Sequence, residues 1–381
     1  MSWRLLLPLI ALLSGCGATP SVTTLAPTTV VNVATSPLRL IGMQQLAPDL
    51  HHDGIRVGGI SGMDYDAASG DWLLASDDRG QHGPARLYRA RMDVGAQRVG
   101  PVVVESTVVL RQADGTRYPA WGRPGVSADL EALRVDPVDG SIWIASEGDR
   151  KARVPSFVRR VDAHGAHLGE LPYPPSLQIQ PDCDCGGRSN MGFEGISFTD
   201  DGKLLWLALE APPLQDGPVP APGRPALTRI TLADRDGKVV AQYAYPLDAA
   251  PTPAFAGGFV DNGISEILAS SPQRLLVLER AGRQIAGTRF GFDVRLYEVD
   301  LAQASRLDPA TPLGRQQVLP GVKRLLFDTA RLPVDWADNY EAMAWGPPLA
   351  DGRRVLVIAS DNNFNGGPTR FLVFDADAVQ Q

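Results

Sequence analysis

The stretch that decides the fold lies in the middle of the chain, between Phe193 and Glu210. It reads Phe193-Glu194-Gly195-Ile196, a turn at Asp200-Asp201-Gly202, and then Leu205-Trp206-Leu207-Ala208-Leu209-Glu210. Two short apolar runs on either side of an Asp-Gly turn are typical of an antiparallel β-hairpin. An acid stands near the start of the first run and another follows the end of the second.

The same hairpin pattern recurs along the whole chain. Its first-strand markers stand at positions 61, 131, 194, 266 and 341, which are 63 to 75 residues apart. Self-similarity at such a period indicates a repeat architecture. The other four copies read Ile60-Ser61-Gly62-Met63 with Trp72–Asp77, Leu130-Glu131-Ala132-Leu133 with Ile142–Glu147, Ser265-Glu266-Ile267-Leu268 with Leu275–Glu279, and Tyr340-Glu341-Ala342-Met343 with Leu356–Asp361.

Each of the first four copies continues into two further predicted strands. The fifth has only one, at Arg370–Phe374, and the N-terminal stretch Leu38–Met43 can supply its missing partner. The sequence therefore predicts an all-β protein: a β-propeller of five four-stranded blades closed by an N-terminal strand. A sixth blade within the insertions is the alternative, and the insertions are 111–129, 172–192, 211–226, 249–262 and 301–320.

The composition supports this prediction. The chain has 381 residues, with 39 Gly and 32 Pro, a turn-rich usage that disfavours a helical bundle. Its net charge is −7, and no basic run stands out, so we expect no nucleic-acid partner.

The N-terminus has the pattern of an export signal. Arg4 precedes the apolar run Leu5–Leu13, and Leu13-Ser14-Gly15-Cys16 resembles the lipobox of bacterial lipoproteins. We expect residues 1–15 to be a signal peptide, Cys16 to be lipidated, 16–36 to be a flexible tether and 37–381 to be the propeller domain. The protein would then be anchored by lipid in the bacterial cell envelope, on the periplasmic side of the outer membrane. Ordinary signal cleavage beside an incidental cysteine is the alternative.

Acids occupy matching places in the repeats. In a propeller, the loop that enters the first strand and the loop that leaves the second strand lie on the same face. Nine of the ten residues at these two places are carboxylates, and the exception is Ser61. The nine are Asp77, Glu131, Glu147, Glu194, Glu210, Glu266, Glu279, Glu341 and Asp361.

Many carboxylates around one channel mouth repel one another, and cations relieve that repulsion. Oxygen ligands in this number suit Ca²⁺, and Mg²⁺ or Mn²⁺ would also fit. The lack of clustered His or Cys argues against zinc and copper. Three of the acids in the loops that leave the second strands are followed by an arginine, namely Arg79, Arg150 and Arg280. Cations at these places suit an anionic substrate such as a phosphate. Alternatively, each acid caps a turn or pairs with an Arg of the next blade.

These hairpins together resemble the phytase-like domain family, also described as esterase-like activity of phytase. The resemblance rests on Glu131-Ala132-Leu133 with Ser146-Glu147-Gly148, Phe193–Ser197 with Ala208-Leu209-Glu210, Ile264-Ser265-Glu266 with Leu278-Glu279-Arg280, and Tyr340–Met343. It covers about residues 38 to 376. It implies a propeller, an exported protein and hydrolysis of phosphate or carboxylic esters.

A metal-activated water is the mechanism that we expect, with Glu194, Glu210 and His82 as catalytic groups. A Ser-His-Asp arrangement is disfavoured, because Gly59-Ile60-Ser61-Gly62-Met63 breaks the Gly-x-Ser-x-Gly pattern at its last position. The sequence thus predicts a monomeric hydrolase of small anionic esters. The alternative is a periplasmic module that binds a ligand or metal without turnover. Cys183 and Cys185 could pair locally, although a loop feature is the simpler interpretation.

Overall fold

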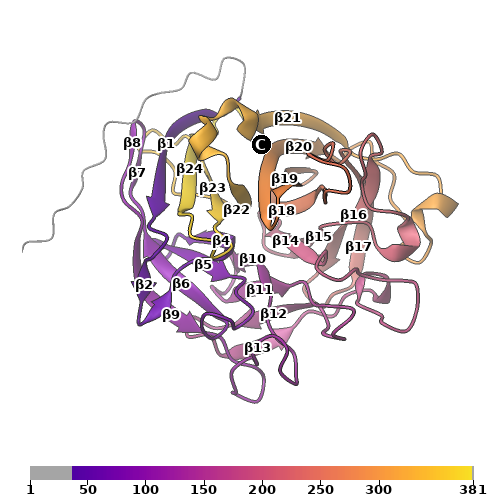
Figure 1. Ribbon diagram of the computed structural model, residues 1–381, viewed down its shortest axis with the longest axis horizontal. Helices are drawn as coiled ribbons and strands as arrows, with labels where there is room; N and C mark the ends of the chain where they lie inside the picture. Colours follow the sequence, from indigo (N-terminus) through magenta and orange to yellow (C-terminus); the bar gives the residue numbers. More distant parts are fainter. Residues whose placement is uncertain (1–36, 380–381) are drawn as a thin grey trace, which may run out of the picture.

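Five antiparallel sheets stand around a central axis (Figure 1). They are seen in a computed structural model that describes residues 37–379. Blade I contains β4 (Ile60–Asp66), β5 (Asp71–Ser76), β6 (Arg86–Arg91) and β9 (Val103–Val109). Blade II contains β10 (Leu130–Val135), β11 (Ile142–Ser146), β12 (Phe157–Val161) and β13 (His167–Glu170). Blade III contains β14 (Phe193–Phe198), β15 (Leu204–Leu209), β16 (Ala226–Asp234) and β17 (Val239–Leu247).

The remaining two blades come from the C-terminal part of the chain and from its N-terminal strand. Blade IV contains β18 (Gly263–Ser271), β19 (Arg274–Ala286), β20 (Arg289–Asp300) and β21 (Val322–Asp328). Blade V contains β22 (Asn339–Trp345), β23 (Val355–Asp361), β24 (Thr369–Asp375) and β1 (Arg39–Leu46). The innermost strands contact one another in the closed order β4, β10, β14, β18, β22 and back to β4.

The ring is therefore a five-bladed β-propeller, as the repeats predict. Among residues 37–379 the insertions form no sixth blade. The N-terminal closing strand is also confirmed: β1 pairs antiparallel with β24, with Leu40 opposite Phe374. Joining the two ends of the described chain in one sheet closes the ring, while the outermost strand of each blade remains an edge.

Small elements complete the described part of the chain. Two short hairpins are formed by β2 (His51–His52) with β3 (Ile55–Arg56), and by β7 (Val94–Gly95) with β8 (Arg98–Val99). Five 3₁₀ turns are η1 (Pro175–Leu177), η2 (Leu214–Asp216), η3 (Leu313–Arg315), η4 (Thr329–Arg331) and η5 (Val334–Trp336). No helix among residues 37–379 is long and apolar enough to cross a membrane. The signal peptide 1–15, the lipidation at Cys16 and the tether 16–36 lie outside the described residues.

The core lies between the blades. The second strand of each blade is apolar on both faces because each face packs against a neighbouring blade. β11, for example, is buried along its whole length, and so is β5. Trp72 and Trp206 are among the largest fully buried side chains. This packing explains why the sequence shows continuous apolar runs rather than strict alternation.

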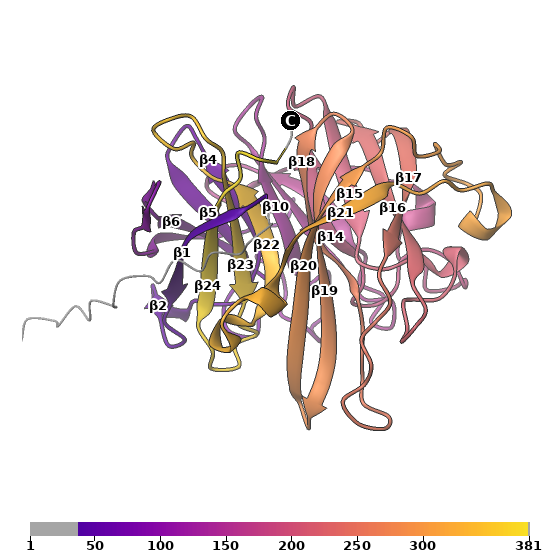
Figure 2. The same ribbon diagram turned by 90° about the horizontal axis from the view of Figure 1, so that it is seen from above.

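Blade IV differs from the others in the length of its central hairpin. β19 has 13 residues and β20 has 12, whereas β5 and β6 have six each. The extra length carries the hairpin beyond the body of the propeller (Figure 2). It extends past Arg280, and therefore on the face where the leaving loops lie.

Candidate functional site

A bulge near the start of every innermost strand builds the centre of the site. In each blade the pairing between the first and second strands skips one residue. A bulge re-aims the side chain that it leaves unpaired. The skipped residues are Ser61, Glu131, Glu194, Ser265 and Glu341.

This register corrects the predicted position of Glu266. In blade IV the unpaired residue is Ser265, and Glu266 pairs with Leu278. Glu266 thus stands where the other blades have Gly62, Ala132, Gly195 and Ala342. Its carboxylate lies 2.9 Å from the guanidinium of Arg134, and both groups are buried. Glu266 therefore does not line the acid-rich mouth.

The residues that follow the second strands show the same displacement by one residue in blade IV. The residue just before the bulge in each innermost strand pairs with a residue of the second strand, and these partners are Ser76, Ser146, Leu209, Glu279 and Ser360. The next residue in four blades is a carboxylate: Asp77, Glu147, Glu210 or Asp361. In blade IV the next residue is Arg280.

Because successive strand residues point to opposite sides, Glu279 faces away from the mouth. It accepts hydrogen bonds from Tyr245 Oη at 2.7 Å and from Asn262 Nδ2 at 2.9 Å, and it pairs with Lys323. The prediction that Glu279 joins the ring is therefore wrong in position. The sequence pattern matched Glu279 to the other acids by residue type, whereas the strand register places the cation Arg280 at the equivalent position.

The other seven of the nine predicted acids line one cavity of about 360 Å³. It opens at the end of the channel where the leaving loops lie. The acids in its wall are Asp77, Glu131, Glu147, Glu194, Glu210, Asp261, Glu341 and Asp361, and the cations are Arg79 and Arg280. Seven of these eight acids are among the nine that the sequence singled out. We call this cavity the acid pocket.

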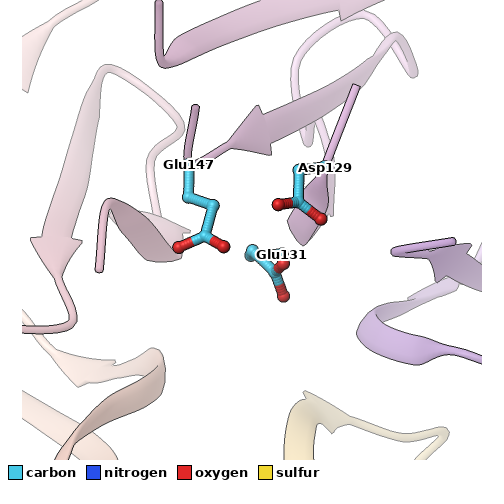
Figure 3. Close-up of side chains that lie close together, drawn as sticks. All are labelled: Asp129, Glu131 and Glu147. Atoms are coloured by element: carbon cyan, nitrogen blue, oxygen red, sulfur yellow. The ribbon is translucent and has the colours of Figure 1, made fainter. Parts of the chain in front are cut away.

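Two trios of carboxylates meet at Glu147. One oxygen each from Asp129, Glu131 and Glu147 lie within 4.8 Å of one another, and the same holds for Glu147, Glu194 and Glu210. Figure 3 shows the first trio converging from the ends of two neighbouring strands of blade II. All five residues are buried. Glu147 also accepts a hydrogen bond from the backbone N–H of Gly192 at 3.3 Å.

Glycine makes room for this crowding. An added Cβ at Gly192 would lie 2.4 Å from the carbonyl oxygen of Glu147, and one at Gly263 would lie 2.4 Å from Cγ of Glu210. Both distances are far below a normal contact. Each glycine thus lets the acid of the preceding blade lie across the start of the next innermost strand.

The two arginines offset part of the negative charge. Arg79 Nε lies 2.7 Å from Asp129, and its Nη2 donates to Asn190 Oδ1 at 2.6 Å. Arg280 lies between two blades, with Nη2 at 2.9 Å from Glu210 and Nε at 3.1 Å from Glu341. Two cations facing eight lining carboxylates leave the acid pocket strongly negative when its acids are ionised.

Burial and mutual repulsion disfavour that ionised state. Burial raises the pKa of Glu131 well above its usual range, and the charge of Glu194 adds to the effect. Burial likewise raises the pKa of Glu147 and of Glu194 well above the usual range. Burial raises the pKa of Glu210 to about 8 although Arg280 lowers it, and burial raises the pKa of Asp77 to about 8. Without a counter-charge, these raised pKa values favour the protonated form of the carboxyls.

The donor set fits a divalent cation. All the converging donors are carboxylate oxygens, the ligands that hard cations prefer. One buried oxygen at the pocket, Asn339 Oδ1, has no hydrogen-bond partner among the described residues. A buried unpaired oxygen is costly, and coordination would satisfy it. The acid clusters could therefore bind a metal ion.

Two predicted site residues lie elsewhere. Arg150 donates to the backbone carbonyls of Cys183, Cys185 and Gly187, so it braces a loop and does not line the acid pocket. His82 is exposed and stacks on Phe364, with ring centroids 4.1 Å apart. It lines a smaller adjoining cavity rather than the acid pocket. Neither position follows from the spacing of Arg150 and His82 to the nearest leaving acid.

Cys183 and Cys185 form a disulfide within that braced loop. Their Cα atoms are 5.3 Å apart. The local pairing considered for the sequence is thus present, and it lies outside the acid pocket.

Sequence reasoning missed three groups at the site. Asp129 stands two residues before Glu131, and Asn339 stands two residues before Glu341. The two-residue spacing along a strand end was the signal that could have found both. Asp261 lies in the insertion before β18 and reaches Arg280 at 3.9 Å, which no repeat position predicts.

Comparison with known proteins fits this architecture. Residues 55–364 match the phytase-like family, described as esterase-like activity of phytase. The chain belongs to this family. No curated protein matches it. Membership in the phytase-like family fits an ester hydrolase at the level of the family.

Solved structures with low sequence identity also match. One is the Cps50 (Swd1) β-propeller domain from Myceliophteria thermophila, at 11% identity and a TM-score of 0.33, covering 84% of this chain and 97% of that chain. Another is the periplasmic gluconolactonase PpgL from Pseudomonas aeruginosa, at 14% identity and a TM-score of 0.36, covering 85% and 87%.

Proposed function

We propose that the acid pocket hydrolyses ester bonds with the help of a divalent cation, and that phosphate esters are the substrate class that fits it best. The observation that carries this proposal is the pair of buried carboxylate trios sharing Glu147. Trios of this kind can bind a cation, and a cation beside arginine suits an anionic ester.

Asp129, Glu131 and Glu147 are the residues that would hold the cation. Ca²⁺ takes six to eight oxygen ligands in flexible geometry, which suits a crowded carboxylate site; Mg²⁺ or Mn²⁺ is the second choice. The described residues lining the acid pocket include no His or Cys, so the softer metals have no preferred ligands. The bound cation would supply Lewis-acid chemistry, drawing charge from an ester oxygen and making water more acidic.

Glu194 and Glu210 would move the protons. Glu210 Oε1 accepts from Arg280 Nη2 at 2.9 Å, which leaves Oε2 to hold a proton. A raised pKa suits a group that gives a proton to a leaving alcohol oxygen. Glu194 stands beside Glu210 in the same trio, and burial raises its pKa as well. The positive charge of a bound cation would lower that pKa, so that Glu194 would accept the proton of the attacking water.

Arg280 and Arg79 would orient the anion. Both residues line the pocket, and their side chains are partly exposed, at 16% for Arg280 and 26% for Arg79. Planar guanidinium groups match the oxygens of a phosphate with paired hydrogen bonds. These two residues, without Arg150, form the anion-binding part of the proposal.

The test is an assay of the purified protein on an aryl phosphate and on an aryl acetate, each with Ca²⁺ and with chelator. We expect Ca²⁺-dependent release of the aryl alcohol from the phosphate, and at least about a 100-fold loss in Glu194→Gln with its melting temperature retained. Glu266→Gln is the matched control, because that acid lies outside the acid pocket. Turnover of neither ester, together with a lower melting temperature in chelator, would instead support a metal-binding module without catalysis.

A further inference from the structure

An aromatic wall borders the acid pocket on the side of blade IV. Phe259, Phe290 and Phe292 all line the pocket. Phe259 is 50% exposed and Phe290 is 39% exposed. Large apolar side chains gathered and left open beside a polar cavity are typical of a ligand site.

The long hairpin of blade IV holds this wall in place. Phe290 and Phe292 are two residues apart on β20, so both project from the same face of the hairpin. Phe290 lies opposite Gln284 and Phe292 lies opposite Gly282 in the β19–β20 ladder. β18 pairs with β19 only as far as Arg280, and β21 pairs with β20 only from Arg295 onward. The part of the hairpin that carries these two rings therefore extends beyond the four-stranded sheet, and Figure 2 shows the long hairpin formed by β19 and β20.

The insertion before β18 adds a third backbone segment to the wall. Gln284 N–H donates to the carbonyl of Phe259 at 2.9 Å, and Asp261 N–H donates to the carbonyl of Gly282 at 3.1 Å. The ring of Phe259 meets that of Phe290 edge-on, with centroids 5.9 Å apart. The ring of Phe259 is therefore carried on hydrogen-bonded backbone rather than on an unsupported loop.

Glycine is required at the join between the wall and the acids. Gly282 N–H donates to Asp261 Oδ1 at 2.7 Å, and an added Cβ at Gly282 would lie only 2.4 Å from that oxygen. Arg280 sits next to this join, with its guanidinium 5.8 Å from the centre of the Phe292 ring. The anion-binding arginine and the aromatic wall thus belong to one hairpin.

The pocket continues outward along the wall. A second cavity of about 690 Å³ shares Phe290, Phe292 and Asn363 with the acid pocket, and its other lining residues are Ile285, Thr288, Arg289 and Asn365. A group attached to an ester in the acid pocket would therefore find apolar surface beside it, and then open space.

We propose that this wall binds the aromatic alcohol part of the substrate, so that the site takes monoesters of aromatic alcohols rather than small alkyl or highly charged esters. The inference rests on the proposed ester hydrolysis for the position of the ester group. The rings supply edge and face contacts for a planar group. The excess of carboxylates over arginines in the wall of the acid pocket disfavours substrates that carry several phosphates.

The test measures binding without turnover, using calorimetry on the Ca²⁺-loaded protein. The probes are naphthylmethylphosphonate and methylphosphonate, which share a head group that cannot be hydrolysed at its P–C bond, and 2-naphthol, which lacks that head. We expect the naphthyl phosphonate to bind at least about tenfold more tightly than the methyl phosphonate. In Phe290→Ala and Phe259→Ala this preference falls to within about threefold, while methylphosphonate binds as before.

Phe255→Ala is the matched control. Phe255 is 43% exposed, stands four residues before Phe259 and does not line the acid pocket. The preference should be unchanged in this variant. Equal binding of the two phosphonates, or equal losses in Phe255→Ala and Phe290→Ala, would overturn the inference.

The third probe separates this inference from the proposed function. If 2-naphthol binds in a Phe290-dependent way while neither phosphonate binds, the aromatic subsite stands and the phosphate head group is wrong. If none of the three binds, the aromatic subsite is wrong, and the esterase assay alone then decides the proposed function.

Discussion

Blades II and IV occupy equivalent places in the ring but bring opposite chemistry to the channel mouth. Blade II contributes Asp129, Glu131 and Glu147, three buried acids within reach of one cation. At the matching positions, blade IV contributes Ser265 and Arg280. The difference teaches that one repeat, with the same bulge, can present either acids or a cation at the channel mouth. In the proposed function these would be the metal-binding half and the anion-binding half of the site.

The largest effect is expected where the two trios overlap. Glu147→Gln removes one charge from both trios while preserving shape and the contact with Gly192. We expect kcat/KM on an aryl phosphate to fall about 1,000-fold at moderate Ca²⁺, because cation binding and transition-state stabilisation are weakened together. Steady-state kinetics over a range of Ca²⁺ measures this. Activity within about threefold of the parent protein would contradict the role of blade II.

The next effect concerns the cation of blade IV. Arg280→Gln removes the charge between Glu210 and Glu341, and we expect KM for the phosphate ester to rise about 10- to 100-fold because the anion loses a charged partner. Arg150→Gln is the control, since that arginine holds loop carbonyls outside the acid pocket. Kinetic constants for both variants, with melting curves, check the comparison. An equal rise in KM for Arg150→Gln would reverse the assignment.

A smaller effect is expected on stability as pH changes. Burial raises the pKa of Asp77 and of Glu210 to about 8, so the folded state binds more protons than the unfolded chain between about pH 4.5 and 8. In chelator the free energy of unfolding should therefore fall as pH rises through this window, by up to about 1.4 kcal/mol per pH unit for each such carboxyl.

Saturating Ca²⁺ should flatten that slope, because the cation offsets the charge of the ionised acids. Denaturant unfolding at several pH values, with chelator and with Ca²⁺, measures both slopes. Stability in chelator that increases between pH 5 and 8 would show that the acids are not crowded as described.

The smallest effect on turnover is expected for Glu266→Gln. This acid lies against Arg134 at 2.9 Å, one residue after the unpaired Ser265 of the bulge. Gln keeps the shape and an acceptor oxygen, so kcat/KM should change by less than about twofold. A loss comparable to that of Glu194→Gln would place Glu266 back in the catalytic site.

The fold could be predicted from the sequence because each blade repeats a local pattern. The hairpin around Gly202, the apolar second strands and the closing strand β1 all follow from short-range signals. The fourth blade shows where such reasoning fails. Its acids at 266 and 279 match the repeat in residue type, while the bulge at Ser265 shifts both by one residue.

The loops were less predictable for a different reason. The positions of Arg150 and His82 depend on contacts with residues far along the chain, namely the Cys183–Cys185 loop and Phe364. Spacing to the nearest acid carries no information about such contacts. Asp261 and the rings of Phe259 and Phe290 were missed because they lie in an insertion and in a hairpin extension found in blade IV alone among the described blades.

The most direct measurement is a calorimetric titration of Ca²⁺ into the metal-free protein and into Glu147→Gln, with Glu266→Gln as the folded control. We predict saturable binding in the parent protein and in Glu266→Gln, and a loss of at least about tenfold in affinity in Glu147→Gln. Absence of saturable binding to the parent protein, or unchanged affinity in Glu147→Gln, would contradict the claim that the carboxylates converging on Glu147 hold a cation.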